Sequence, residues 1–322
     1  MRRIAALPLL LALLSPSTLA RKADVLWTIE DPHGDDRGEG SLVYPLESDM
    51  RPGDLDLVSL TAKEEKGGTR FEARFARPIP NPGTRVIDAG GGTLADIARL
   101  GFYTTNLDIY VDLDRQPASG SINTLPGRRM TVDPAFAWER VICLTPRPSD
   151  AASAAKRLIA KTLKKEAREE NPRVDQADDR RIEAEVAREV ESKIFFPTQV
   201  SISGSTIRFW VPGEVLNGPA KPTYGYAIAV SGADIEQRFK MGAAVGLDSL
   251  GDEQGLMILP LGPSPSRERF GGGRDGDVTQ PQVVDIVVPP GKTQAAVLGD
   301  YDARTGKFAV LPGIVPAELA KP

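Results

Sequence analysis

The sequence has a single cysteine, Cys143, and a single histidine, His33, and these two scarcities exclude several classes of site. One cysteine cannot form an internal disulfide, so a hydrophobic core must stabilise the fold. Zinc sites built from histidine and cysteine need several such ligands. A Ser-His-Asp triad would have to use His33, which is followed by Gly34 in an acidic turn. Carboxylate chemistry remains, either an acid pair as in glycosidases or the binding of a hard cation.

The chain also lacks an excess of basic residues and, after its first twenty residues, a long apolar run. Residues 1–20 place Arg2 and Arg3 before an apolar run and small residues before Ala20, which predicts a signal peptide cleaved near Ala20. Without those two arginines, 38 basic residues face 44 acidic ones, a net charge of −6. This balance disfavours nucleic acid as a partner. We expect a periplasmic or extracellular protein with no transmembrane segment.

Strand patterns dominate the rest of the chain. Glycine and proline together make up 58 of the 322 residues, which suits a fold with many turns. Between these turns, apolar and polar residues alternate with a period of two, as in half-buried strands. The strand-like runs are residues 70–76, 106–114, 206–211, 226–230, 283–288, 295–298 and 307–311. The pattern predicts an all-β fold, a jelly-roll-like antiparallel β-sandwich formed as one module over residues 24–315.

Residues 150–193 break the strand pattern. The segment is rich in Ala, Lys, Arg and Glu, and an apolar stripe recurs every four residues from Ile182 to Ile194. Asn171 and Pro172 are predicted to be the N-cap and first turn of a second helix. We therefore expect a helical hairpin inserted between strands. It would be either an exposed charged excursion or an arm that docks a partner.

The stretch "DPHGDDRGEGSLVYP", residues 31–45, gathers carboxylates and glycines around His33. It does not fit an EF-hand loop, because its third position is His33 and its sixth is Asp36 rather than glycine. Asp31, Asp35 and Asp36 are nevertheless candidate ligands of a calcium ion, the one cofactor that the sequence suggests. The alternative is a solvated turn whose Asp side chains cap backbone amides.

A second acidic group lies on the strand "NLDIYVDLD", residues 106–114. One face is apolar, and the other carries Asp108, Tyr110, Asp112 and Asp114. This polar face could bind sugar hydroxyls, bind calcium, supply a glycosidase acid pair, or be an ordinary solvated sheet surface. We assign no catalytic residue, because an open strand lacks the enclosed cleft that keeps one carboxylic acid protonated.

Trp210 is the best candidate among the tryptophans for stacking on a sugar ring. It lies on the opposite side of its strand from Ile207 and Phe209, next to the polar Arg208. The candidate carbohydrate-binding residues are therefore Asp108, Tyr110, Asp112 and Trp210.

Several segments resemble one known family. "DPHGDDRGEGSLVYP" followed by "PGDLDLVSL" is similar to the opening of the C-terminal module of glucodextranase and related amylolytic enzymes. "NLDIYVDLD", "TLPGRR" and "WERVICL" resemble its middle strands, and "RFGGGRDGD" with "VVDIVVPPG" resembles its closing segment. The resemblance implies a β-sandwich related to sugar-binding and cell-surface modules, with a non-catalytic role beside a hydrolase.

From these observations we expect an exported, non-catalytic module that binds carbohydrate or a cell-envelope glycan and is stabilised by calcium. An amylolytic enzyme on another chain is the expected protein partner, because the module occupies the whole mature sequence. Two alternatives remain open. One is a glycoside hydrolase that uses Asp108, Asp112 or Asp114; the other is a structural envelope protein that docks a partner through residues 150–193.

Overall fold

The computed structural model describes residues 24–46, 50–85, 93–173, 175–233, 258–274 and 276–319. The signal peptide predicted over residues 1–20 lies outside this set. Every helix among the described residues is too short or too polar to span a membrane.

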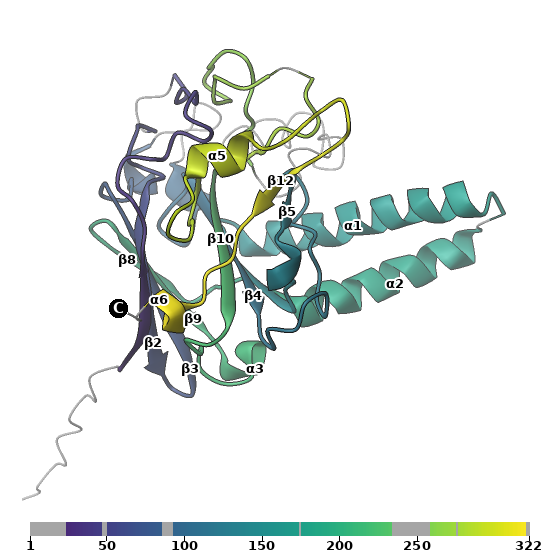
Figure 1. The fold of residues 1–322 in the computed structure, drawn as a ribbon, viewed down its shortest axis with the longest axis horizontal. Helices are drawn as coiled ribbons and strands as arrows, with labels where there is room; N and C mark the ends of the chain where they lie inside the picture. Colours follow the sequence, from purple (N-terminus) through teal and green to yellow (C-terminus); the bar gives the residue numbers. More distant parts are fainter. Residues whose placement is uncertain are drawn as a thin grey trace, which may run out of the picture.

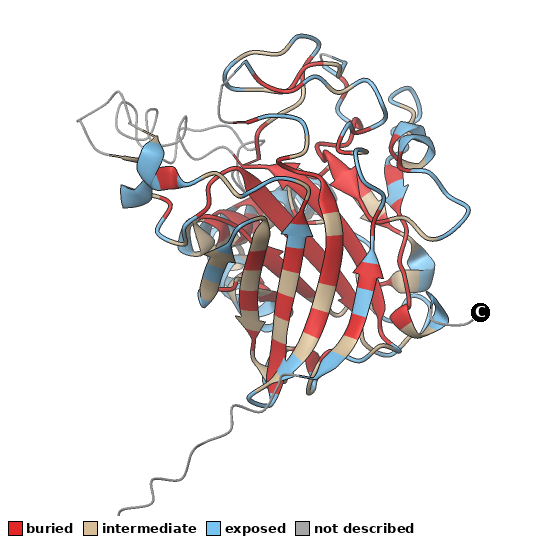
Figure 2. Cartoon of the chain, turned by 90° about the vertical axis from the view of Figure 1, so that its left-hand side faces the viewer, coloured by how far each residue is buried: buried red, intermediate tan, exposed pale blue. Residues whose placement is uncertain are grey.

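Five antiparallel strands form the first sheet (Figure 1). Along these strands, buried residues alternate with less buried ones, as Figure 2 shows. The inward side chains include Phe71, Ala73 and Phe75, as their alternation with polar residues predicted. In spatial order the strands are β1 (Val25–Glu30), β2 (Leu57–Glu65), β3 (Gly68–Phe75), β9 (Thr206–Val211) and β8 (Val200–Ser203).

The second sheet also has five strands, and all its pairings are antiparallel except that between β6 and β7. Its order is β11 (Asp285–Ile286), β10 (Gly225–Gly232), β4 (Thr105–Asp112), β6 (Arg140–Leu144) and β7 (Ile194–Phe195). A short parallel pair joins β5 (Met130–Val132) to β12 (Ala309–Leu311). The prediction of mainly antiparallel β structure is confirmed.

The largest hydrophobic cluster contains inward side chains from both sheets. Trp27 of the first sheet and Tyr226 of the second bring their ring centroids within 4.5 Å of each other. Leu107, Ile109 and Val111 of β4 belong to the same cluster and are fully buried. The apolar face predicted for this strand therefore packs between the sheets, where its burial is a main source of stability.

The other face of β4 is buried too, so the solvated or ligand-binding surface predicted there is wrong. All eight residues of the strand are buried. A second hydrophobic cluster covers this face and joins Tyr110 and Cys143 to small side chains of the helices, among them Ala151 and Ala155. Alternation along a strand shows two unlike faces, but it does not show that a second layer covers the polar one.

The expected helical hairpin is present as α1 (Pro148–Glu170) and α2 (Gln176–Lys193), which extend away from the sheets in Figure 1. Three cross-helix ion pairs mark an antiparallel register: Lys156 with Glu191, Lys164 with Glu183, and Arg168 with Asp179. The helix boundary differs from the prediction. Asn171 ends α1, whereas Asp175 caps α2 by accepting hydrogen bonds from the Ala177 and Asp178 amides.

One predicted strand is a helix. Residues 295–298 lie in α5 (Gln294–Gly299). Thr293 is the N-cap of this helix, and its Oγ1 accepts a hydrogen bond from the Ala296 amide. The remaining helices are short: α3 (Gly213–Leu216), α6 (Pro316–Leu319) and the 3₁₀ turns η1 (Pro82–Thr84), η2 (Leu94–Asp96) and η3 (Pro134–Phe136).

Contact between the hairpin and the second sheet can be tested at Ala155, which is fully buried in α1. The substitution Ala155→Asp places a charge without a partner in the second cluster, and we expect it to lower the free energy of unfolding by about 3 kcal/mol or more. The control is Lys165→Asp on the exposed side of the same helix, expected to change stability by less than about 1 kcal/mol. Urea unfolding measures both; equal effects would contradict the packing described here.

Candidate functional site

Three carboxylates from distant parts of the sequence meet beside the first sheet, where β1 ends and β2 begins. Asp31 follows β1, Asp35 lies in the next turn, and Asp285 begins β11. One carboxylate oxygen from each lies within 4.8 Å of the others. Asp56, just before β2, adds a fourth negative charge that acts on all three. We call these four residues the acidic centre.

Backbone hydrogen bonds hold the carboxylates of the acidic centre in place. Asp285 Oδ2 accepts from the Leu57 amide at 2.8 Å, and Asp56 Oδ2 accepts from the Gly34 amide at 2.7 Å. Asp31 continues the β1–β2 pairing by donating its own amide to the Val58 carbonyl at 3.0 Å. Hydrogen bonds thus fix the carboxylates of Asp56 and Asp285 and the backbone of Asp31.

Gln294 of α5 fastens the turn to β11 from the other side. This buried amide side chain donates to the Asp35 carbonyl and, at 3.2 Å, to the Gly38 carbonyl. Its Oε1 accepts a hydrogen bond from the Ile286 amide at 2.7 Å. The glutamine therefore joins the loop that carries Asp35 to the strand that carries Asp285.

Five oxygen atoms of the acidic centre are buried and have no hydrogen-bond partner: both of Asp31 and Oδ1 of Asp35, Asp56 and Asp285. Asp31 is 8% exposed, and Asp56 and Asp285 are 0% exposed. Buried polar atoms are nearly always paired in native proteins, since an unpaired one loses its hydration without replacement. In the acidic centre, no hydrogen bond replaces the hydration that these five oxygens lose on burial.

The electrostatics of the centre follow from this crowding. Burial, together with the charges of Asp35 and Asp56, raises the pKa of Asp31 to about 8. Burial and the neighbouring carboxylates also raise the pKa of Asp35 to about 6, and burial raises that of Asp285 well above its ordinary value. Among the described residues, the basic side chain in contact is the exposed His33, whose Nδ1 lies 3.5 Å from Asp56 Oδ2.

Asp36, predicted to be a third ligand beside Asp31 and Asp35, has a different environment. Its buried carboxylate accepts hydrogen bonds from the Tyr44 hydroxyl and, at 2.6 Å, from the Gly53 amide. It thereby holds the turn against the loop before β2. Asp285 takes the place expected for Asp36, and its signal in the sequence is a lone carboxylate inside the apolar run "VVDIVV".

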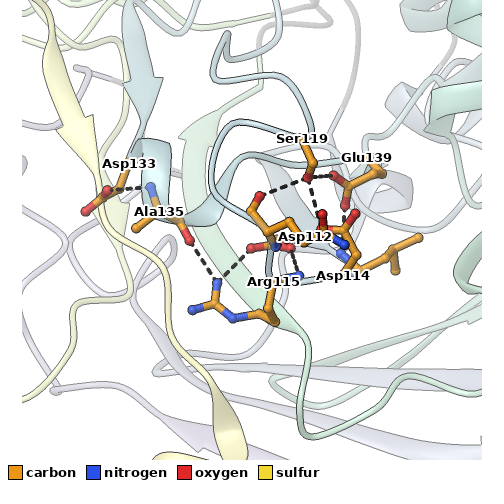
Figure 3. A network of polar contacts seen from close by, with 9 residues as sticks. Asp112, Asp114, Arg115, Ser119, Asp133, Ala135 and Glu139 are labelled. Atoms are coloured by element: carbon orange, nitrogen blue, oxygen red, sulfur yellow. Dashed lines mark hydrogen bonds and ion pairs between the residues drawn. The ribbon is translucent and has the colours of Figure 1, made fainter.

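A second acidic group, formed by Asp112, Asp114 and Glu139, looks similar by distance but differs in its contacts (Figure 3). Asp112 accepts from both the backbone amide and Nη1 of Arg115, at 2.6 and 2.7 Å. Ser119 Oγ bridges Asp114 and Glu139 at 2.9 and 3.1 Å. Figure 3 shows these contacts closing into one network. The carboxylates of this group therefore already have hydrogen-bond donors within the protein.

Asp108 and Tyr110, two of the candidate sugar-binding residues, have internal partners. Arg128, which is 0% exposed, donates Nε to Asp108 Oδ2 at 2.5 Å and Nη2 to Oδ1 at 3.0 Å. The Tyr110 hydroxyl accepts a hydrogen bond from the Leu125 amide at 3.0 Å. Asp112, the third candidate on this strand, is also buried, so none of the three presents a surface to a ligand.

Trp210, the fourth candidate, lies half-buried on the outer face of the first sheet. Its Nε1 donates to the Glu65 carbonyl at 3.2 Å. Around it lies a network of ion pairs centred on Glu72, which contacts Lys63 at 2.7 Å and Arg70 at 3.3 Å. The ring is therefore fixed on a polar surface.

A large groove lies between the hairpin and the loop that precedes β5. This groove has a volume of about 1310 Å³ and is lined by polar, charged and apolar side chains. Asn123 and Thr124 line the loop side, Lys165 and Leu163 line the α1 side, and Trp138 lies between them and is almost fully buried. Sequence reasoning missed this groove, because it arises from contact between segments far apart in the chain.

The family model of the C-terminal, SLH-like binding module of glucodextranase matches residues 26–314. No curated protein matches the chain.

The buried ion pair gives a test of the role of Asp108. The substitution Asp108→Asn leaves the Arg128 guanidinium buried without a counter-charge, and we expect unfolding free energy to fall by about 3–5 kcal/mol. The exposed Asp114→Asn is the control and should cost less than about 1 kcal/mol. Chemical denaturation measures both.

A double variant separates the ion pair from simple loss of packing. In Asp108→Leu with Arg128→Met, neither charge is buried alone, so stability should recover most of what Asp108→Asn loses. Wild-type stability in Asp108→Asn would show that the pair does not hold this face of β4.

Proposed function

The chain belongs to the family of the C-terminal, SLH-like binding module of glucodextranase, and on this premise we propose that it is an exported, non-catalytic module that binds carbohydrate or a cell-envelope glycan. The family match carries the proposal, because it runs from within β1 to the segment after β12. The fold we propose in detail is a jelly-roll-like β-sandwich, supported by the hydrophobic cluster that the two sheets share.

The contacts of the acidic residues support a non-catalytic role. A glycosidase needs two carboxyl groups on either side of a substrate cleft, one of them protonated at working pH. Asp108 is paired with the buried Arg128, and Asp112 with Arg115. Both carboxylates are thus engaged with protein side chains and do not face each other across a cleft open to a substrate.

We place the glycan in the groove between the hairpin and the loop before β5. A pyranose ring has apolar faces and a rim of hydroxyl groups, so its site needs both apolar contact and hydrogen-bonding side chains. The groove offers the exposed Leu163 and Val278 together with Asn123, Thr124 and Lys165. The face around Trp210 is the second candidate surface, because its ring lies among polar side chains.

The proposal includes a partner and an ion. An amylolytic enzyme is the proposed protein partner, since the family is named for a module of such an enzyme. Calcium is proposed as a structural ion that stabilises the module and takes no part in chemistry.

Binding can be measured by affinity gel electrophoresis with α-glucans and with isolated envelope polysaccharides. We expect retention by at least one of them, and we expect the double variant Asn123→Ala with Lys165→Ala to weaken it about tenfold through loss of two hydrogen-bonding side chains. Migration that no polysaccharide retards would contradict the proposed function.

Trp210→Ala is the matched control on the other surface. It should leave retention unchanged if the glycan occupies the groove. The reverse result, weaker retention for Trp210→Ala and normal retention for the groove variant, would move the site to the outer face of the first sheet.

Export has a separate readout. The protein recovered from the periplasm or medium should begin at Arg21, because the small residues before it form the cleavage site. Mass spectrometry of the intact chain measures this. A recovered chain that keeps Met1 would contradict the predicted signal peptide.

A further inference from the structure

We propose that the acidic centre is a calcium site whose ligands include the unpartnered oxygens of Asp31, Asp35 and Asp285. It lies apart from the groove and does not depend on the proposed glycan. Asp56 contributes its charge and its own unpartnered oxygen beside the other three residues. The proposal changes the ligand set that the acidic turn suggested, because Asp36 is bound elsewhere and Asp285 comes from the far end of the chain.

A cation accounts for the unpartnered oxygens better than the protein itself does. In the acidic centre, Asp56 and Asp285 each use one oxygen to accept a backbone amide and leave the other unused, while Asp31 leaves both unused. In the second acidic group, Arg115, Ser119 and backbone amides satisfy the carboxylates. The two groups have similar spacing, but the first is more deeply buried and lacks hydrogen-bond donors for these oxygens. A bound cation supplies the missing interaction.

The ligand chemistry selects calcium. The three residues that meet there offer only carboxylate oxygens as ligands, and the nearby His33 is an exposed side chain beside Asp56, so the group suits a hard cation rather than metals that prefer nitrogen or sulfur ligands. Two oxygens bound to one Ca²⁺ at 2.3–2.6 Å are separated by at most about 5 Å, and one carboxylate oxygen each of Asp31, Asp35 and Asp285 lies within 4.8 Å of the others. Ca²⁺ also tolerates irregular coordination, bidentate carboxylates and loop carbonyls, whereas Mg²⁺ demands a near-ideal octahedron and keeps its waters.

The ion would join three segments that the chain does not connect locally. Asp31 and Asp35 belong to the turn after β1, Asp56 leads into β2, and Asp285 opens β11 in the other sheet. Because these residues meet only when both sheets have formed, the site exists only in the folded chain. Binding therefore stabilises the native state, and removal of the ion leaves repelling carboxylates at the junction of the sheets.

The test uses the full mature protein, freed of metal with chelator and studied without glycan. Titration calorimetry with calcium chloride should show one ion per chain. Thermal unfolding should shift upward by about 5 °C or more at a hundredfold excess of calcium over Kd. Magnesium at the same concentration should give a clearly smaller shift; an equal shift would overturn the assignment to calcium. A melt that responds to neither calcium nor chelator would overturn the site.

Asp285→Asn distinguishes a ligand from a residue that only supports the fold. In calcium its melting temperature should lie below that of the wild type, with calcium affinity at least about tenfold weaker. In chelator it should be as stable as the metal-free wild type or more stable, because one of the crowded, uncompensated carboxyl groups is gone. Lower stability under both conditions, with an unchanged calcium shift, would contradict a ligand role.

Two further variants complete the design. Asp35→Asn is half-buried, so it provides the same test if Asp285→Asn does not fold. Asp114→Asn, in the second acidic group, should keep the full calcium shift and affinity. A calcium response lost in Asp114→Asn and kept in Asp35→Asn would place the ion in the second group and overturn the proposal.

Discussion

Burial of both faces of the second sheet is the constraint on which the rest of the structure depends. Its inner face packs on the first sheet, and its outer face carries a second hydrophobic cluster covered by the hairpin. The polar groups buried on β4 are then compensated best by partners inside the protein. Asp108 finds the guanidinium of Arg128, and Tyr110 finds a backbone amide. The hairpin is therefore part of the fold, because its buried side chains belong to the same hydrophobic cluster as Tyr110 and Cys143 on this face of the sheet.

Where a carboxylate is buried, the partners that it has inside the protein indicate its role. Asp108 has an arginine as partner, and the group around Asp112 has an arginine, a serine and backbone amides. The acidic centre, which is more deeply buried than the group around Asp112, has backbone amides on one side and unpartnered oxygens on the other. Spacing alone does not separate these cases, because two of the groups meet the same distance criterion. What separates them is whether the protein supplies the donors.

Period-two alternation predicted β3 and β9 well, because one face of the first sheet is in contact with water. It predicted β4 as a strand but misjudged its polar face, since the layer over that face comes from distant segments, among them Leu125, Met130 and the helices of residues 150–193. The apolar run at 295–298 was too short to separate helix from strand. Asp31 and Asp35 could be found as neighbours in sequence, whereas Asp285 joins them only through the pairing of β11 with β10.

The register of the hairpin has a mechanical consequence. Buried side chains of α1 end at Ala160, and those of α2 begin at Val186, so only the half of the arm nearest the sheets is fixed by packing. Beyond them, the pairs of Lys164 with Glu183 and Arg168 with Asp179 link the helices at or near the surface. Such pairs weaken as salt screens them, whereas apolar packing does not. The hairpin is therefore rigid where it packs near the sheets, and the stiffness of its outer half depends on ionic strength.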